Sequence, residues 1–261
     1  MTQTKSIRTI AATRYVTPLK EGGSVPAIIE GDDDGMYVLK FRGAAQGVKT
    51  LIAELIAGEI ARALELPVPE LVFVELDADL ARAEPDPEIQ SVIRASGGLN
   101  IALDYLPGSI TFDPVADQPP ADLASLIVWF DAFVTNVDRT PRNTNMLMWH
   151  RRLHLIDHGA CLYFHHAWDD YLASSASAFR QIRDHVLLPF ASNLAAADET
   201  AGARLDEQRL QEIVALVPDD WLQGEPAFAS AQAARDAYTA FLISRFSQRR
   251  VFVEEAIRAR A

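Results

Sequence analysis

The residue pattern changes part-way along the chain, and this change limits the folds that the chain can adopt. Alternating or β-branched apolar runs dominate the first part, at residues 9–16, 25–30, 36–41, 71–76 and 99–105, which predicts strands. One helical run covers residues 50–66, and helical patterns dominate after residue 113, with helices expected at 176–188, 205–216 and 231–258. The acidic residues 77–88, rich in Ala and Pro, are expected to form a surface excursion. We therefore expect an α+β fold with two lobes. Residues 1–104 would form an antiparallel sheet plus the helix 50–66, residues 105–113 a hinge, and residues 114–261 a mostly helical lobe.

Composition narrows the possible functions. The chain has 261 residues, 49% of them hydrophobic, and a net charge of −12. So acidic a chain is a poor candidate for direct nucleic-acid binding, which depends on Lys and Arg neutralising phosphates. We expect no membrane span and no signal peptide, because no apolar run is long enough for the first and the N-terminus lacks the apolar segment of the second. Cys161 is the single cysteine, so we expect no internal disulfide and a cytoplasmic protein.

A polar segment, residues 136–145, separates a helix expected at 122–135 from two short strands expected at 144–149 and 152–156. Within it, Asp138 precedes Asn143 by five positions. A second acid, Asp157, follows the second expected strand, and Gly159 stands two residues later, where it permits a sharp backbone turn. Asp and Asn are ordinary turn residues, so the information lies in the order: an Asp, then an Asn, then a hairpin, then another Asp.

That order is typical of enzymes that transfer a phosphoryl group from ATP. The first Asp orients or deprotonates an acceptor hydroxyl, while the Asn and the second Asp hold the metal ions that bridge the phosphates. The sequence therefore predicts Asp138, Asn143 and Asp157 as catalytic residues, with Asn143 and Asp157 as ligands of Mg²⁺. ATP and an unidentified hydroxyl acceptor, either a protein or a small molecule, would be the partners.

Phosphate-binding candidates lie upstream. Lys40, near the end of an expected strand, can reach phosphates as a point charge, although exposed strand lysines are common. Glu54 lies on the largely apolar face of the helix 50–66, where a carboxylate needs a partner. Glu59 and Glu65 compete for that role.

Gly22, Gly23 and Ser24 form a turn whose backbone amides are candidates for phosphate contact. A plain hairpin turn explains these three residues equally well.

Four arginines run against the acidic balance of the chain. Arg139, Arg142, Arg151 and Arg152 cluster around the polar segment. They are expected either to attract an anionic substrate or the ATP phosphates, or to form a solvated rim. The sequence leaves both interpretations open.

Several of these segments together resemble the HipA-like kinases, bacterial relatives of the protein kinase fold. The resemblance rests on Tyr-Val-Leu-Lys-Phe at 37–41, Ala-Glu-Leu at 53–55, Leu-Pro-Val-Pro at 66–69, the loop 136–143 and Ile-Asp-His-Gly at 156–159. It implies a bilobal kinase fold in which Lys40 anchors ATP and Glu54 is its ion-pair partner. Asp138 would be the catalytic Asp, and Asn143 and Asp157 the metal ligands. The hinge beside the adenine would be formed by Asp104, Tyr105 and Leu106.

The chain also departs from HipA itself. It is much shorter, and it has no clear match to the loop with the serine whose autophosphorylation controls HipA, for which Ser24 is the nearest stand-in. A toxin role is therefore not implied. The expected activity is Mg²⁺-dependent transfer from ATP to a hydroxyl, foremost of a protein Ser or Thr. Alternatives are a phosphoinositide-type kinase, whose catalytic segment is similar, a small-molecule kinase, an ATP-binding pseudokinase that regulates without transfer, and a pure interaction domain.

Overall fold

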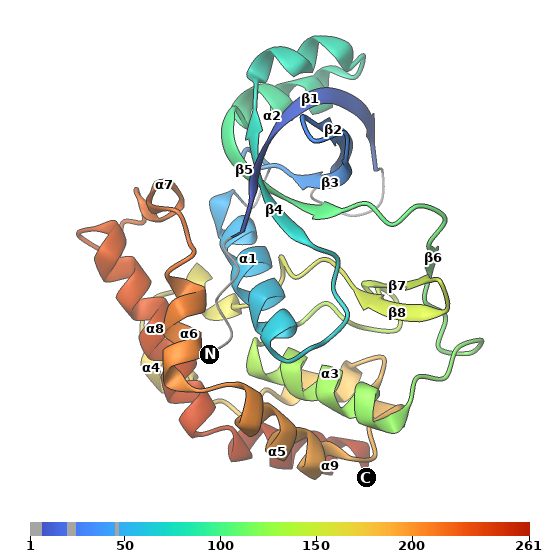
Figure 1. The fold of residues 1–261 in the computed structure, drawn as a ribbon. Coiled ribbons are helices and arrows are strands. Elements are labelled where there is room, and N and C mark those ends of the chain that lie inside the picture. Colours follow the sequence, from blue (N-terminus) through green and yellow to red (C-terminus); the bar gives the residue numbers. More distant parts are fainter. Residues whose placement is uncertain (1–6, 20–24, 45–46) are drawn as a thin grey trace. The chain divides into compact units, whose positions relative to one another are not determined.

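Five strands form a closed barrel in the computed structural model, which describes residues 7–19, 25–44 and 47–261 (Figure 1). The strands are β1 (Thr9–Pro18), β2 (Ala27–Gly31), β3 (Met36–Lys40), β4 (Leu71–Leu76) and β5 (Gly98–Asp104), in the order β1-β2-β3-β5-β4. The chain divides into two compact units. The first comprises Met1–Leu55 and Pro69–Pro107, and the second Ile56–Val68 and Gly108–Ala261.

The barrel corrects the expectation of a purely antiparallel sheet. Four of its pairings are antiparallel, but β1 runs parallel to β4, with Thr9 opposite Phe73. A parallel pair needs a long crossover connection, and β2, β3 and a helix supply it here. Because inward and outward side chains alternate with a period of two in both kinds of pairing, the residue pattern alone does not reveal the direction of the partner strand.

The first unit also holds more helix than the single one expected. α1 (Val48–Ala63) begins two residues before and ends three residues before the expected helix 50–66. The acidic stretch expected as a surface excursion contains the 3-10 helix η1 (Ala78–Ala83) and the helix α2 (Pro87–Ala95). Asp86 accepts a hydrogen bond from the Glu88 amide at the start of α2, so its acidic and proline-rich sequence is that of a capped helix start.

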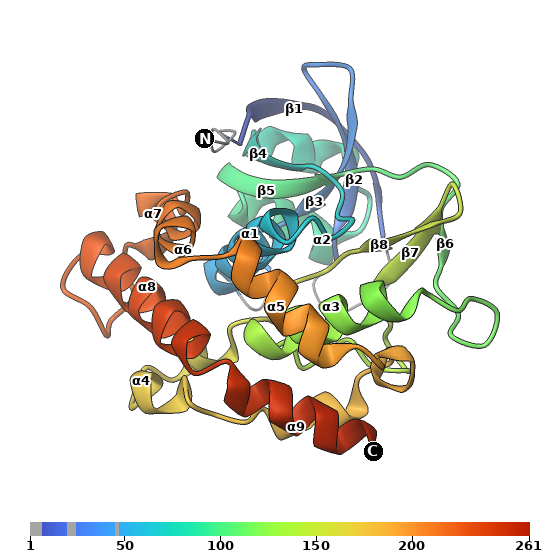
Figure 2. The same cartoon turned by 60° about the horizontal axis from the view of Figure 1, so that its bottom comes forward.

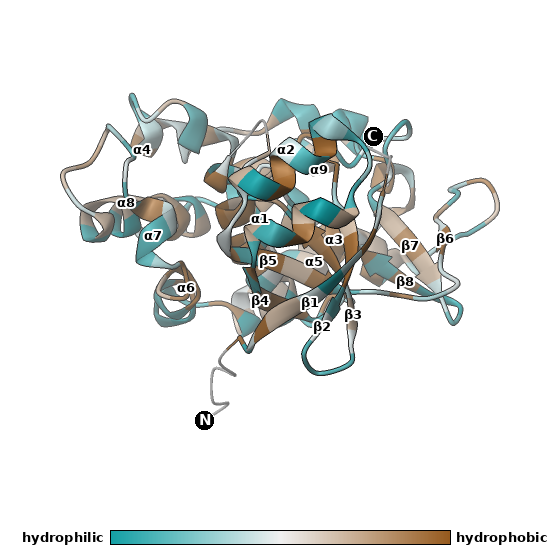
Figure 3. Cartoon of the chain, turned by 90° about the horizontal axis from the view of Figure 1, so that it is seen from above, coloured by the Kyte–Doolittle hydropathy of each residue, from teal (hydrophilic) through white to brown (hydrophobic). Residues whose placement is uncertain are grey.

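The core of the first unit lies inside the barrel and under α2. Tyr37 and Leu39 point inward from β3, and Ile89 and Ile93 add the apolar side of α2. Figure 3 shows hydrophilic and hydrophobic residues side by side along α2, as expected of a helix with one buried face.

The second unit is mostly helical and includes one three-stranded sheet of β6 (Ile110–Thr111), β7 (Met146–Trp149) and β8 (Arg152–Leu155). Its central helix is α3 (Ala121–Phe133), in which every residue from Ala124 to Phe133 is buried. α5 (Leu194–Arg204) and α9 (Arg250–Arg260) pack on α3 (Figure 2). The remaining helices are η2 (Tyr163–His166), α4 (Tyr171–Ser174), η3 (Arg180–Asp184), η4 (Leu188–Phe190), α6 (Glu207–Val214), α7 (Asp219–Leu222) and α8 (Ala231–Ser247).

Two helix expectations differ from the structure. The helix expected at 176–188 is replaced by the short 3-10 helices η3 and η4, and the long helix expected at 231–258 is divided into α8 and α9. Within residues 7–19, 25–44 and 47–261, none of the helices combines the length and apolarity that a membrane span requires.

The end of α3 is fixed by a buried arginine from α8. Arg245 donates to the carbonyl oxygens of Ala132 and Phe133, and also to those of Ser175 and Ser177. The last carbonyls of a helix have no partner within the helix, and a cation beside them is favoured by the helix dipole. Arg245 therefore anchors the point at which the polar segment 136–145 leaves α3.

Candidate active site

The polar segment after α3 folds back on itself and brings Asp138 against Asn143. Asn143 Nδ2 donates to Asp138 Oδ2 over 2.7 Å, and Asn145 Nδ2 donates to the same oxygen over 3.2 Å. A tight turn makes this possible, because the Thr140 amide donates to the Asn143 carbonyl over 3.0 Å and the Asn143 amide donates back over 3.1 Å. Asn143 is exposed and Asp138 is half-buried, so both remain accessible.

The β7–β8 hairpin brings Asp157 to the end of this loop. Met146 pairs with Leu155, and the Ile156 amide donates to the Asn145 carbonyl over 3.0 Å. Asp157 is the next residue and adopts a left-handed backbone with φ 55°. The sequence suggested that Gly159 would make the sharp turn, but the left-handed residue is Asp157 itself. Such a conformation in a non-glycine residue is uncommon and is concentrated at functional sites.

A buried network beneath the loop holds Asp138 in place. The fully buried carboxylate of Asp131, on α3, accepts from Asn136 Nδ2 over 2.8 Å and from Arg139 Nε over 2.6 Å. Asn136 Oδ1 in turn accepts from the Asp138 amide over 3.0 Å, and Arg139 Nη1 donates to the Asn145 carbonyl. Residues on both sides of the loop are thus tied to one carboxylate.

Opposing effects set the ionisation of Asp131. Burial alone would raise its pKa, but the charge of Arg139 and the hydrogen bonds from His185 and Arg139 outweigh burial and hold the pKa below the usual range. Asp131 is therefore ionised at neutral pH and forms a buried ion pair with Arg139.

His185, after η3, completes the network from a distant part of the chain. Its Nε2 lies 2.8 Å from Asp131 Oδ2, and the Leu187 amide donates to its Nδ1 over 3.0 Å. A ring nitrogen that accepts a hydrogen bond carries no proton. The proton of His185 that faces Asp131 is therefore on Nε2, which donates it to the carboxylate.

Sequence reasoning missed Asp131, Asn136 and His185, and it did not assign Asn145 a role. Asp131 lies inside α3, where every residue from Ala124 to Phe133 is buried. The usable signal was an acid in an otherwise apolar helix, because a buried carboxylate requires partners. For His185 no local signal exists, since it lies 54 positions from Asp131.

In the first unit, Lys40 and Glu54 form a buried ion pair. Lys40 Nζ lies 3.8 Å from Glu54 Oε2, and the side chains are 5% and 0% exposed. Leu39 points into the barrel, and side chains alternate along a strand. Lys40, the next residue, therefore projects from the other face of β3. The competing acids have other partners: Glu59 pairs with Arg62 over 2.7 Å, and Glu65 with Arg204 over 2.8 Å.

The expected hinge residues, Asp104, Tyr105 and Leu106, lie at the end of β5 and directly after it. The Asp104 amide donates to the Glu70 carbonyl over 2.8 Å and the Tyr105 amide to the Met36 carbonyl over 2.9 Å, while Leu106 is buried. Burial and the negative charge of Glu70 raise the pKa of Asp104.

Gly22, Gly23 and Ser24, the candidates for a phosphate-binding turn, lie outside the described residues.

The donor atoms at the loop fit a magnesium ion. Asn143 donates from Nδ2 to Asp138, and its Oδ1 makes no hydrogen bond to the described residues, while Asp157 adds a carboxylate. Mg²⁺ prefers such oxygen ligands and is typically held by one or two carboxylates together with substrate phosphates, not by an all-protein cage. Among the described residues no group of three or more His, Cys, Asp and Glu side chains is placed to hold a metal.

Comparison with known proteins identifies the family. A sequence model of HipA-like kinases matches residues 13–252. The chain belongs to the HipA-like kinase family. It is therefore a kinase, an enzyme of the phosphotransferase class. No curated protein sequence matches it.

Two solved kinase structures are similar to this chain. A Helicobacter pylori proinflammatory kinase, CtkA, superposes with a TM-score of 0.53 at 15% identity, over 96% of this chain and 97% of that one. The Golgi casein kinase with Mn/ADP bound superposes with a TM-score of 0.49 at 13% identity, over 96% of this chain and 73% of that one. The likeness to CtkA shows that this HipA-like kinase has a protein-kinase-like fold.

Proposed function

We propose that this HipA-like kinase transfers the γ-phosphoryl group of ATP to the hydroxyl of a protein Ser or Thr, with Mg²⁺ as the metal. The observation that carries the proposal is the cluster at one end of the β7–β8 hairpin. There Asn143 and Asn145 both bind Asp138, and Asp157 follows directly after the pairing of Ile156 with Asn145.

Asp138 orients the acceptor hydroxyl. Both asparagine amides bind its Oδ2, and within the described part of the chain its Oδ1 makes no hydrogen bond. Oδ1 is thus available to accept from the incoming hydroxyl and to align it for in-line attack. Since the two amides fix the carboxylate plane, this alignment needs little reorganisation at the moment of reaction.

Asn143 and Asp157 would hold Mg²⁺, which neutralises the charge developing on the phosphate oxygens when it is bound. Lys40 would contribute a second positive charge to the phosphates, kept in place by Glu54. Asp104, Tyr105 and Leu106 would contact the adenine.

A protein acceptor is supported by the accessibility of the loop. Asn143 is exposed, and the two residues before it, Pro141 and Arg142, are exposed as well. A side chain presented on a polypeptide can therefore approach the loop.

The test is incubation of the purified protein with γ-labelled ATP, Mg²⁺ and a set of acceptors: dephosphorylated proteins, phosphoinositide vesicles and small polyols. Label on protein Ser or Thr, lost in both Asp138→Asn and Asp157→Ala, is the expected result. Label on the lipid or the polyol alone would show that the acceptor is not a protein. ATP binding by thermal shift without any transfer would show a pseudokinase.

A further inference from the structure

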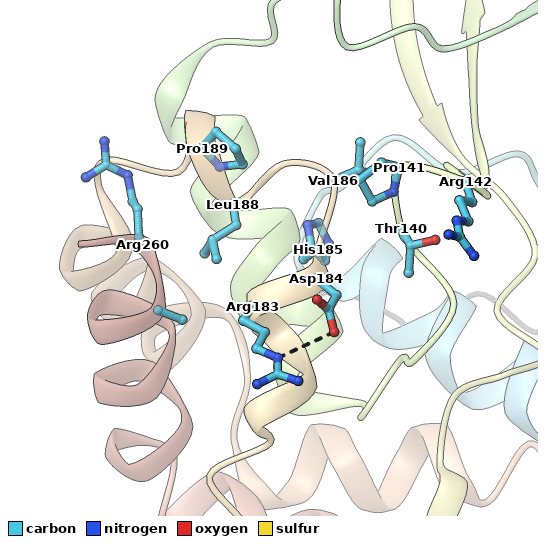
Figure 4. A pocket seen from close by; sticks show the side chains of 11 residues that line it. Thr140, Pro141, Arg142, Arg183, Asp184, His185, Val186, Leu188, Pro189 and Arg260 are labelled. Carbon is cyan, nitrogen blue, oxygen red and sulfur yellow. Dashed lines mark ion pairs between the residues drawn. The ribbon is translucent and has the colours of Figure 1, made fainter.

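A cavity of about 790 Å³ lies beside the proposed catalytic loop within the second unit. Three parts of the chain line it: residues 140–142 of the loop, residues 183–189 around η3 and η4, and the last turn of α9 (Figure 4). The buried ring of His185 forms part of its wall. The cavity shares residues with the loop and is separate from the oxygen cluster of Asp138 and Asp157.

The cavity is basic in an otherwise acidic protein. Its lining carries the guanidinium groups of Arg142, Arg183 and Arg260 against the single carboxylate of Asp184. Figure 4 shows the three guanidinium groups on different sides of the cavity. Such an arrangement in a chain with a net charge of −12 concentrates a local positive potential that attracts anions.

These arginines are poorly neutralised. Arg183 Nε lies 3.7 Å from Asp184 Oδ2, and both side chains are mostly exposed, so this ion pair is weak. Among the described residues no carboxylate side chain forms an ion pair with Arg142 or Arg260. Guanidinium groups bind carboxylates and phosphates in a two-pronged geometry, which leaves two of the three ready for an anionic ligand.

The cavity lies within a few residues of the acceptor position. Arg142 directly precedes Asn143, whose Nδ2 is 2.7 Å from Asp138 Oδ2. An extended polypeptide advances by about 3.3–3.6 Å per residue. A peptide whose hydroxyl reaches Asp138 can therefore place a side chain two to four positions away in the cavity.

We propose that the cavity formed by Arg142, Arg183 and Arg260 binds acidic side chains that flank the acceptor Ser or Thr, so that this kinase selects acidic segments of its protein substrate. The inference rests on the proposed protein-kinase function. The positive charge of the cavity indicates acidic substrate segments. The proposal also gives a role to Arg142, which takes no part in the proposed chemistry of the loop.

The test compares two fluorescein-labelled peptides that differ only in charge. One carries Asp and Glu at the positions flanking a central Ser, and the other carries Asn and Gln at the same positions. Binding is measured by fluorescence anisotropy without ATP. We expect the wild-type protein to bind the acidic peptide at least tenfold more tightly, and the difference to shrink as salt is raised.

Variants connect this preference to the cavity. Arg183→Gln/Arg260→Gln removes two exposed charges and should abolish the preference, whereas Arg250→Gln, an exposed arginine near the other end of α9, should preserve it. Arg142→Gln is a second variant with the same expectation as the double variant. Equal binding of both peptides by the wild type, or a preference retained in the double variant, would overturn the proposal.

Measuring phosphorylation of the same two peptides distinguishes the acidic preference from the proposed kinase function. Phosphorylation of the acidic peptide with a higher kcat/KM than the neutral one, lost in the double variant, supports both. Equal phosphorylation together with equal binding overturns the acidic preference and leaves the kinase function standing. Selective binding without transfer to any acceptor supports the cavity as an acidic-segment site and overturns the proposed transfer.

Discussion

His185 donates through Nε2 to the carboxylate of Asp131 over 2.8 Å, and through this carboxylate it reaches the proposed catalytic loop. Asp131 also binds Asn136 and Arg139, and Asn136 accepts from the Asp138 amide. His185 thus acts as a positioning residue at one remove from Asp138.

Replacing His185 should lower turnover more than substrate binding. His185→Ala leaves a buried carboxylate short of one donor, at a cost of about 1–3 kcal/mol. The loop should then sample more orientations, so kcat falls while KM for ATP changes little. His185→Gln, whose Nε2 can donate to Asp131, should restore much of kcat. If His185→Ala and His185→Gln reduced stability equally and left kcat untouched, the residue would be purely structural.

Asp131 should make the free energy of unfolding decrease at low pH. Its pKa is held below the ordinary value of 3.8 in the folded state, so the folded protein binds a proton less readily than the unfolded chain. The resulting stabilisation is complete above that ordinary value and is lost as the pH falls through the lower folded pKa.

Asp131→Asn tests this sign. At pH 6 the variant should be less stable by roughly 3–5 kcal/mol, because the charge of Arg139 stays buried without its partner. The gap to the wild type should narrow below about pH 4, as measured by urea unfolding at several pH values. Asp220→Asn, an exposed acid on α7, is the matched control. A gap that stays constant down to pH 3 would contradict the assignment.

Asn145 should contribute to catalysis through its amide. Its backbone is left-handed, with φ 47°, so Asn145→Gly removes the amide without adding backbone strain. Loss of one of the two donors to Asp138 should reduce kcat about tenfold, or ~1.4 kcal/mol. Asn145→Ala should show the same loss plus lower thermal stability, since alanine disfavours this conformation. Wild-type turnover in Asn145→Gly would remove Asn145 from the site.

The Lys40–Glu54 pair allows binding to be separated from folding. Either Lys40→Met or Glu54→Gln alone breaks a buried ion pair and should destabilise the first unit by about 3–5 kcal/mol. The double variant removes both charges of this pair and should regain part of the lost stability. It should still bind ATP weakly, because the cation proposed to face the phosphates is gone. Differential scanning calorimetry and ATP titration of all four proteins would check both statements. Normal ATP affinity in the double variant would exclude Lys40 from the nucleotide site.

The site residues that the sequence predicts are those whose relationship is local. Asp138 and Asn143 lie within one loop, and Asp157 follows one hairpin later, so strand pairing alone brings them together. Lys40 and Glu54 lie on adjacent elements, and the choice among Glu54, Glu59 and Glu65 needed only side-chain direction on one helix.

The features that escaped prediction depend on distant parts of the chain or on subtle local signals. Nothing near His185 indicates Asp131 as its partner, and nothing in β1 indicates a parallel neighbour. α2 is short, and its acidic, proline-containing start has the composition of a loop. The sequence pointed to only one arginine of the basic cavity, Arg142, because it lies in the loop. Arg183 and Arg260 come from other elements that only the fold brings to the cavity.

The parallel pairing of β1 with β4 has a consequence for how the protein is made. Thr9 meets Phe73 sixty-four positions later in the sequence, so during synthesis the first strand leaves the ribosome well before its second neighbour exists. Pairings of this range are slow to form because a large loop must be ordered first. Until β4 and then β5 emerge, β1, β2 and β3 form a meander with exposed edges, which is open to pairing with other nascent chains. The first unit can therefore close only after the chain has been translated as far as Asp104, the end of β5.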